Sequence, residues 1–162
     1  MLDVGALFAE HHAPLFRYLS RLTGDPDVAE DAAQEAFVKL VEKPPVPGQT
    51  RAWLFRVGTH AAWQTLRTGR RRKRILEGGV DRAPVGDAPP LPDEAAEAAR
   101  ERERVRRALD GLPERDRGIL LMYQEGFKHR EIAESFDVPV HSVGTMVSRA
   151  LRKLALELRL DD

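Results

Sequence analysis

One stretch of polar side chains near the carboxyl end has the residue types and spacing of a surface that reads DNA. Between residues 140 and 153, hydroxyl side chains and arginines recur every three or four positions, which places them on one face of a helix. Such groups hydrogen-bond to base edges and phosphates in the major groove. The predicted DNA contacts on this helix are His141, Ser142, Gly144, Thr145, Ser148, Arg149 and Arg152.

The residues before this face complete a helix-turn-helix. Ile132, Ala133 and Phe136 form the inward side of a short helix, and Asp137 follows where the turn needs a left-handed backbone. The inward positions of the second helix, over about 139–159, are Val143, Met146 or Val147, and Leu151. An ordinary helical hairpin with a solvated polar face is the alternative interpretation of this segment.

The first half of the chain is also predicted to be helical. Apolar spacing indicates a helix around Pro14, which should kink or break it. Asp25-Pro26 is a helix start signal, and the proline-rich segment 43–48 ends that helix. Thr50 can cap a third helix that runs to about Arg74. These elements predict a bundle of three or four helices.

A breaker-rich connector separates this bundle from the rest. Residues 77–93 are rich in glycine and proline, which indicates a flexible linker. The whole chain has no net charge, but residues 1–74 carry +4, residues 75–97 carry −5 and residues 98–162 carry +1. No strand pattern is evident. The predicted fold is all-α, with domains over 1–76 and 94–162.

The C-terminal domain is predicted to hold two helices before the helix-turn-helix. The first runs from Asp93 to about Asp110, with Gly111 as a left-handed stop. The second runs from Pro113 to about Glu125 and is stopped by Gly126.

Several classes of function are excluded by what the sequence lacks. Cysteine is absent, and none of the five histidines belongs to a metal motif. No glycine-rich phosphate loop or nucleophile elbow occurs, so we expect no enzyme, metal, cofactor or small-molecule substrate. No membrane span or signal peptide is evident, and a cytoplasmic protein is expected.

Both halves resemble extracytoplasmic-function sigma factors, in the order that this family has. The C-terminal residues that resemble the family's fourth region are Leu112-Pro113, Arg117, Glu131-Ile132-Ala133, Val138-Pro139-Val140, Val143, Ser148-Arg149-Ala150 and Leu154. Those that resemble its second region are Gly24-Asp25, Ala29-Glu30-Asp31, Gln34-Glu35, Phe37, Trp53-Leu54, Arg56 and Arg67. The resemblance implies an alternative sigma factor that binds the clamp and flap of core RNA polymerase and promoter DNA, under control of an anti-sigma factor.

The resemblance also assigns roles to residues. Five side chains of the second helix would contact the polymerase clamp: Asp27, Glu30, Asp31, Gln34 and Glu35. Contacts to the minus-10 element and nearby backbone would come from Lys43, His60, Trp63, Gln64, Arg67, Arg70, Arg71, Arg72, Lys73 and Arg74. Simple solvation is the alternative for the acidic face, and a solubilising helix end for the basic run. Trp53 is expected to pack, whereas Trp63 is expected either to stack on a base or to pack.

Three residues depart from the family pattern. His60 stands where asparagine is commoner, and Gly144 and Met146 replace frequent basic residues. These departures leave the minus-10 preference and the phosphate anchoring open. The alternative functions are a stand-alone helix-turn-helix regulator and a sigma-like interaction protein without promoter recognition.

Overall fold

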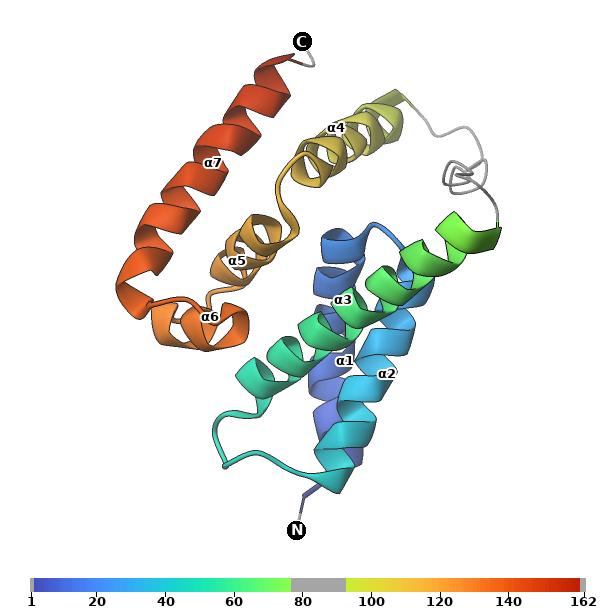
Figure 1. Cartoon of the computed structure of the whole chain (residues 1–162), viewed down its shortest axis with the longest axis vertical. Coiled ribbons are helices and arrows are strands. Elements are labelled where there is room, and N and C mark those ends of the chain that lie inside the picture. The colour runs from blue at the N-terminus through green and yellow to red at the C-terminus, as the bar shows by residue number, and fades with distance from the viewer. Residues whose placement is uncertain (1, 77–92, 161–162) are drawn as a thin grey trace.

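The computed structural model describes residues 2–76 and 93–160, without the side chains of 70–76 and 160. The first block is a bundle of three helices, α1 (Val4–Thr23), α2 (Pro26–Glu42) and α3 (Thr50–Leu76) (Figure 1). The apolar spacing noted in the sequence forms its core, because Leu15, Leu19, Leu40 and Leu54 are fully buried. The predicted linker at 77–93 lies almost wholly outside the described residues.

The ends of these helices follow local signals, with one exception. The Asp25 side chain accepts hydrogen bonds from the backbone N–H groups of Asp27 and Val28, at 3.0 and 3.3 Å, and Pro26 is the first residue of α2. The predicted break at Pro14 is wrong, because α1 continues through it. Interior proline costs about 3 kcal/mol, and burial of the neighbouring Leu15 with the rest of that face offsets this cost.

The C-terminal block contains α4 (Asp93–Asp110), α5 (Glu114–Gln124), α6 (His129–Phe136), a short 3₁₀ turn (Val140–Ser142) and α7 (Val143–Leu160). Figure 1 shows α7 as a long helix that begins beside α6 and runs toward α4. No strand occurs in the described parts of the chain, so the all-α prediction is confirmed.

Two glycines end helices of this block in different ways. Gly126 has a φ of 87°, so it is the left-handed stop predicted after α5. The same prediction for Gly111 is wrong, because Gly111 is absent from the positive-φ residues. A β-carbon on Gly111 would lie 3.2 Å from the Glu157 carboxyl carbon of α7 and 3.3 Å from the Ala108 carbonyl oxygen, so a side chain here would be crowded.

The turn between α6 and α7 has the predicted geometry. Asp137 is left-handed, with φ 53° and ψ 50°, and the Val138 N–H donates to the Ala133 carbonyl oxygen at 3.1 Å. Val143 and Val147 are buried as expected. Leu151 was also predicted to face inward, but 48% of it is exposed, and Ala150 packs inward instead. The inward residues of α7 are therefore Val143, Val147 and Ala150. The steps between them are four and then three residues, rather than four and four.

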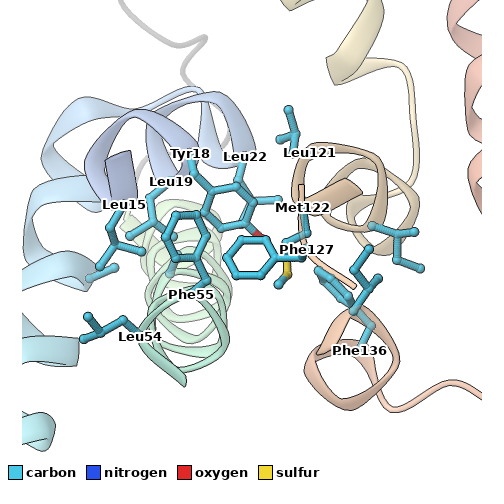
Figure 2. Packing of buried hydrophobic residues seen from close by; sticks show 14 of the residues in the cluster. Leu15, Tyr18, Leu19, Leu22, Leu54, Phe55, Leu121, Met122, Phe127 and Phe136 are labelled. Carbon is cyan, nitrogen blue, oxygen red and sulfur yellow. The ribbon is translucent and has the colours of Figure 1, made fainter. Parts of the chain in front are cut away.

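The two blocks share one hydrophobic cluster. It contains Leu15 and Phe55 from the first block and Met122 and Phe127 from the second. Figure 2 shows Phe127 between the Tyr18–Phe55 side and the helices of the C-terminal block. In the described part of the chain, no helix is long and apolar enough to span a membrane.

Candidate nucleic-acid interface

The outward face of α7 brings together nearly all of the residues predicted to contact minus-35 DNA. Six of them line one shallow hollow of about 550 Å³: His141, Gly144, Thr145, Ser148, Arg149 and Arg152. Ser142 is half-buried and does not line this hollow. The hollow combines two guanidinium groups with hydroxyl groups on one rigid helix, which suits contacts to base edges and phosphates.

Contacts of α7 with α5 and α4 hold this face in position. The Lys153 ammonium lies 3.6 Å from the Asp116 carboxylate on α5. Arg104 of α4 donates to the backbone carbonyl oxygen of Leu158. Because α7 is supported along its length by α5 and α4, its exposed face is presented by a rigid element.

Gly144 lies in the hollow and is not required by the packing of the chain. A β-carbon at this position would meet only the His129 ring carbon Cε1, at 3.8 Å, which is ordinary contact. Its φ is not positive. Alanine would therefore fit in the isolated protein, and the structure gives no internal reason for glycine.

The predicted minus-10 face of α3 carries His60, Trp63, Gln64 and Arg67 at helical spacing. His60, Gln64 and Arg67 are exposed, whereas Trp63 is half-buried. The Trp63 ring packs against Phe136 of α6, with ring centroids 5.5 Å apart, and meets His60 edge-on at 6.2 Å. Trp63 thus packs in this arrangement, and Trp53 likewise packs against the core, as predicted.

The environment of His60 favours the neutral imidazole. Partial desolvation of the ring lowers its pKa below the usual value of 6.5, and the cations Arg56, Arg67 and Lys39 act in the same direction. A hydrogen bond with the backbone of Ser135 raises the pKa, as expected when the ring N–H donates to a carbonyl oxygen. The net effect is a neutral ring at pH 7 beside three positive side chains.

The remaining predicted DNA contacts lie just after α2 and in the last turns of α3. Lys43 is exposed and ends α2, before the loop that leads to α3. The backbone of residues 70–74 is helical, which extends α3 through the basic run to Leu76. The side chains of Arg70, Arg71, Arg72, Lys73 and Arg74 lie outside the described residues.

The acidic face of α2 is formed largely as predicted. Asp27, Asp31 and Gln34 are exposed at spacings of four and three residues. Glu30 is partly exposed but already engaged within the chain, because its carboxylate lies 3.3 Å from the His12 ring and accepts from Gln34 at 3.1 Å. Glu35 pairs with Lys39 at 3.1 Å. The face available to a partner is therefore narrower than the predicted set of five.

The residues that join the two blocks could not be found from sequence patterns. Arg51 at the start of α3 donates from Nη2 to the Glu125 carbonyl oxygen at 2.8 Å. Its guanidinium carbon lies 4.0 Å from the centre of the Phe127 ring, a cation–π contact. Since 74 residues separate Arg51 from Glu125, neither helical spacing nor local motifs could pair them.

Arg117 belongs to the motif that resembles the fourth region, but its role emerges only from the structure. Its buried guanidinium group donates to the carbonyl oxygens of Leu109 and Leu112 within its own block, at 2.9 and 3.1 Å. It also donates to the Leu22 carbonyl oxygen at the end of α1, at 2.7 Å. Arg117 therefore satisfies buried backbone carbonyl groups at or just beyond helix ends in both blocks at once.

The chain is a two-block, all-α protein, and comparisons with known proteins identify its class. Residues 7–72 match Sigma-70 region 2, and residues 102–154 match Sigma-70 region 4. The extracytoplasmic-function (ECF) RNA polymerase sigma factor SigL of Mycobacterium tuberculosis is 33% identical over 159 residues, which are 95% of this chain and 88% of that protein. The corresponding SigE of Mycolicibacterium smegmatis is 29% identical, over 91% of this chain and 58% of that protein.

A solved structure has the same fold. The sigma factor RpoE from Bartonella quintana, crystallised in complex with the anti-sigma factor NepR, superposes with a TM-score of 0.75 at 19% identity and covers 99% of both chains. The chain belongs to the ECF sigma factors of the sigma-70 family. The resemblance found in the sequence is confirmed.

Proposed function

We propose that this protein binds core RNA polymerase and directs initiation at promoters, and that it does so without catalytic chemistry of its own. Membership of the sigma family supports this proposal. The observation that carries it is the polar face of α7 and the turn before it, where six predicted DNA contacts line one hollow. Because promoters and polymerase occupy the bacterial cytoplasm, the protein acts there.

The face of α7 is the proposed minus-35 reader. Arg149 has two donors that match guanine O6 and N7, and Thr145 and Ser148 offer shorter groups beside it. Arg152 and the other polar groups of the hollow would bind phosphates and fix the register. At Gly144 the missing side chain leaves room for close approach of the DNA.

The exposed face of α3 is the proposed minus-10 reader. His60, Gln64 and Trp63 offer hydrogen bonds and a stacking plane, which single-stranded DNA requires. The backbone would be held by positive charge from Lys43, Arg67 and the basic run at 70–74. Linking two modest contacts raises their effective concentration on one promoter. This gain suits a chain whose zero net charge gives it little overall attraction to DNA.

Two partner surfaces follow from the same proposal. The exposed acidic and amide groups of α2, Asp27, Asp31 and Gln34, would bind a basic helix of the polymerase clamp. Control by an anti-sigma factor is proposed because the structural relative RpoE was crystallised with one. A stable binary complex with such a protein would support this control.

One experiment tests the main proposal. Labelled promoter DNA is mixed with this protein alone, with core polymerase alone, and with both together. Specific opening of the duplex only in the combined sample is the expected result. Specific binding without polymerase would instead indicate a stand-alone regulator, and polymerase binding without opening would indicate a sigma-like interaction protein.

A further inference from the structure

Gly144 of the α7 hollow has a histidine beside it on each of two neighbouring elements. His141 belongs to the 3₁₀ turn before α7 and lines the same hollow. His129 is the first residue of α6, and its ring carbon Cε1 would lie 3.8 Å from a β-carbon at Gly144. Sequence spacing placed only His141 on the DNA face, so His129 is brought to this surface by the packing of α6 against α7.

Both imidazole rings are accessible from solvent. The two residues are exposed, and neither ring forms an ion pair or a hydrogen bond within the parts of the chain that the structure describes. His129 instead contacts the Tyr123 ring of α5, with ring centroids 6.3 Å apart and an interplanar angle of 51°. This contact supports the His129 ring beside Gly144 and leaves its nitrogens available to a ligand.

The charged side chains of the hollow are basic. Arg149 and Arg152 line it together with His141, and none of its six lining residues is acidic. A positive charge on the His141 ring would therefore meet no carboxylate in the hollow. An anion from outside the protein, such as a DNA phosphate, would supply the missing negative charge.

The surroundings of His129 are similar. Its neighbours in the sequence are Lys128 and Arg130, and the Glu131 carboxylate already accepts from the Lys128 N–H at 2.9 Å. The titratable group that α5 places against the ring is the Tyr123 phenol, and α7 places Gly144 there. A protonated His129 would thus add to a basic edge of the hollow.

We propose that His129 extends the minus-35 surface as a phosphate contact, and that protonation of His129 and His141 strengthens the binding of DNA. This inference rests on the proposed function, because it takes the α7 hollow to be the DNA surface. Histidine is the side chain whose charge ordinarily changes between about pH 5 and 8. A protonated ring donates from both nitrogens, whereas a neutral ring donates from one. Binding of DNA is therefore accompanied by proton uptake, and the affinity rises as the pH falls.

The low net charge of the C-terminal block makes two added charges important. Residues 98–162 carry only +1 when histidine is counted as neutral. Protonation of His129 and His141 raises this value to +3. Because attraction to the phosphate backbone depends on the positive charge that the protein brings to it, we expect a clear effect on affinity.

The proposal is tested by duplex binding to the full-length protein. Phosphate contacts carry no sequence information, so the probe is a fluorescein-labelled, mixed-sequence duplex of twenty base pairs. Fluorescence anisotropy at pH 6.0 and pH 8.0 gives the dissociation constants, and circular dichroism at each pH confirms that the protein is folded. The wild type should bind about tenfold more tightly at pH 6.0. Equal affinities at the two pH values would overturn the proposal.

The salt dependence distinguishes phosphate contacts from contacts to bases. Each cation that neutralises a phosphate steepens the plot of log affinity against log salt concentration by about 0.9. With two histidines, the slope at pH 6.0 should be steeper than at pH 8.0 by up to about 1.8. A gain in affinity without a steeper slope would overturn the phosphate assignment.

Glutamine variants assign the effect to its residues, because glutamine can hydrogen-bond but carries no charge. His129→Gln and His141→Gln should each remove part of the pH-dependent gain, and the double variant should remove nearly all of it. His12→Gln is the matched control, since the His12 ring lies on α1, 3.3 Å from the Glu30 carboxylate. Full pH dependence in His129→Gln, or its loss in His12→Gln, would overturn the proposal.

Promoter opening with core polymerase separates this inference from the proposed function. If the protein and the polymerase together open no promoter, the proposed function fails, whereas the duplex affinities still decide whether the two histidines bind phosphate. If opening occurs but the wild type is no more pH-dependent than the double variant, the function stands and the inference fails.

Discussion

The ring of Phe136 lies directly over Gly118, and a β-carbon on this glycine would come within 2.5 Å of the ring atoms Cε1 and Cζ. Gly118 is buried in α5, and the same β-carbon would meet Leu22 of α1 at 3.5 Å. Glycine at this position thus allows α6 to approach α5 closely while Phe136 reaches Trp63 on α3.

Gly118→Ala is expected to lower the free energy of unfolding by about 1–3 kcal/mol, because the Phe136 ring must move in a packed interior. Urea unfolding followed by circular dichroism measures this change. Gly69→Ala is the matched control, since Gly69 is in α3 and its β-carbon would meet nothing within 4 Å. The control should gain up to about 1 kcal/mol from helix propensity. Equal effects of the two substitutions would contradict this account of Gly118.

Arg149→Ala is expected to weaken promoter binding by the holoenzyme. Loss of one bidentate contact to a base costs about 1–3 kcal/mol, so the affinity should fall roughly tenfold while polymerase binding is unchanged. A gel-shift titration with promoter DNA measures the first quantity, and pull-down with core polymerase measures the second. Arg159→Ala, at the exposed last turn of the same helix, is the control and should leave both unchanged.

Gly144→Ala should affect promoter binding without lowering the stability of the protein. The new methyl group meets only His129 Cε1 at 3.8 Å, so the isolated protein should be as stable or slightly more stable. Promoter affinity should fall if the DNA approaches closely at this point. Thermal unfolding and the same gel-shift titration give the two readouts. Unchanged promoter affinity would show that glycine is not needed for close approach.

The parts of the fold that were predictable are those set by local chemistry. Asp25 caps α2, Gly126 stops α5 and Asp137 makes the left-handed turn, since each depends on residues within a few positions. Leu151 was wrongly predicted to face inward. The next residue on a helix face can be three or four positions along, and only packing against the neighbouring helix decides which of the two is buried. Gly111 was misassigned because glycine after a helix permits a left-handed backbone but does not require one.

In the candidate site, too, only the features set by nearby residues were predictable. The spacing sufficed to group the predicted DNA face, because α7 carries all of its lining residues except His141, which lies in the 3₁₀ turn just before it. Whether Trp63 packs or stacks could not be decided from α3 alone, since its partner Phe136 belongs to another block. Likewise, Glu30 looked equivalent to Asp31 in the sequence, but His12 of α1 engages only Glu30.

The difference between Glu30 and Asp31 gives a paired prediction for polymerase binding. Asp31→Lys reverses an exposed charge on α2 and should weaken binding to core polymerase about tenfold or more. Glu30→Gln should change that affinity little and instead reduce stability, because it weakens the contact with His12. Fluorescence titration with core polymerase compares the variants. The reverse order of effects would show that Glu30, rather than Asp31, faces the partner.

The environment of His60 predicts how stability depends on pH. Because burial and nearby cations lower its pKa in the folded state below 6.5, the unfolded chain binds a proton more readily. The contribution of the neutral ring is therefore fully present above pH 6.5 and is lost as the pH falls through the lowered folded-state pKa. His60→Asn removes this titration. Unfolding free energies from urea titrations at pH 7.5 and pH 5.5 should fall more for the wild type than for the variant. An equal fall would mean that His60 does not carry the predicted linkage, and a smaller fall for the wild type would mean that the hydrogen bond to Ser135 outweighs burial.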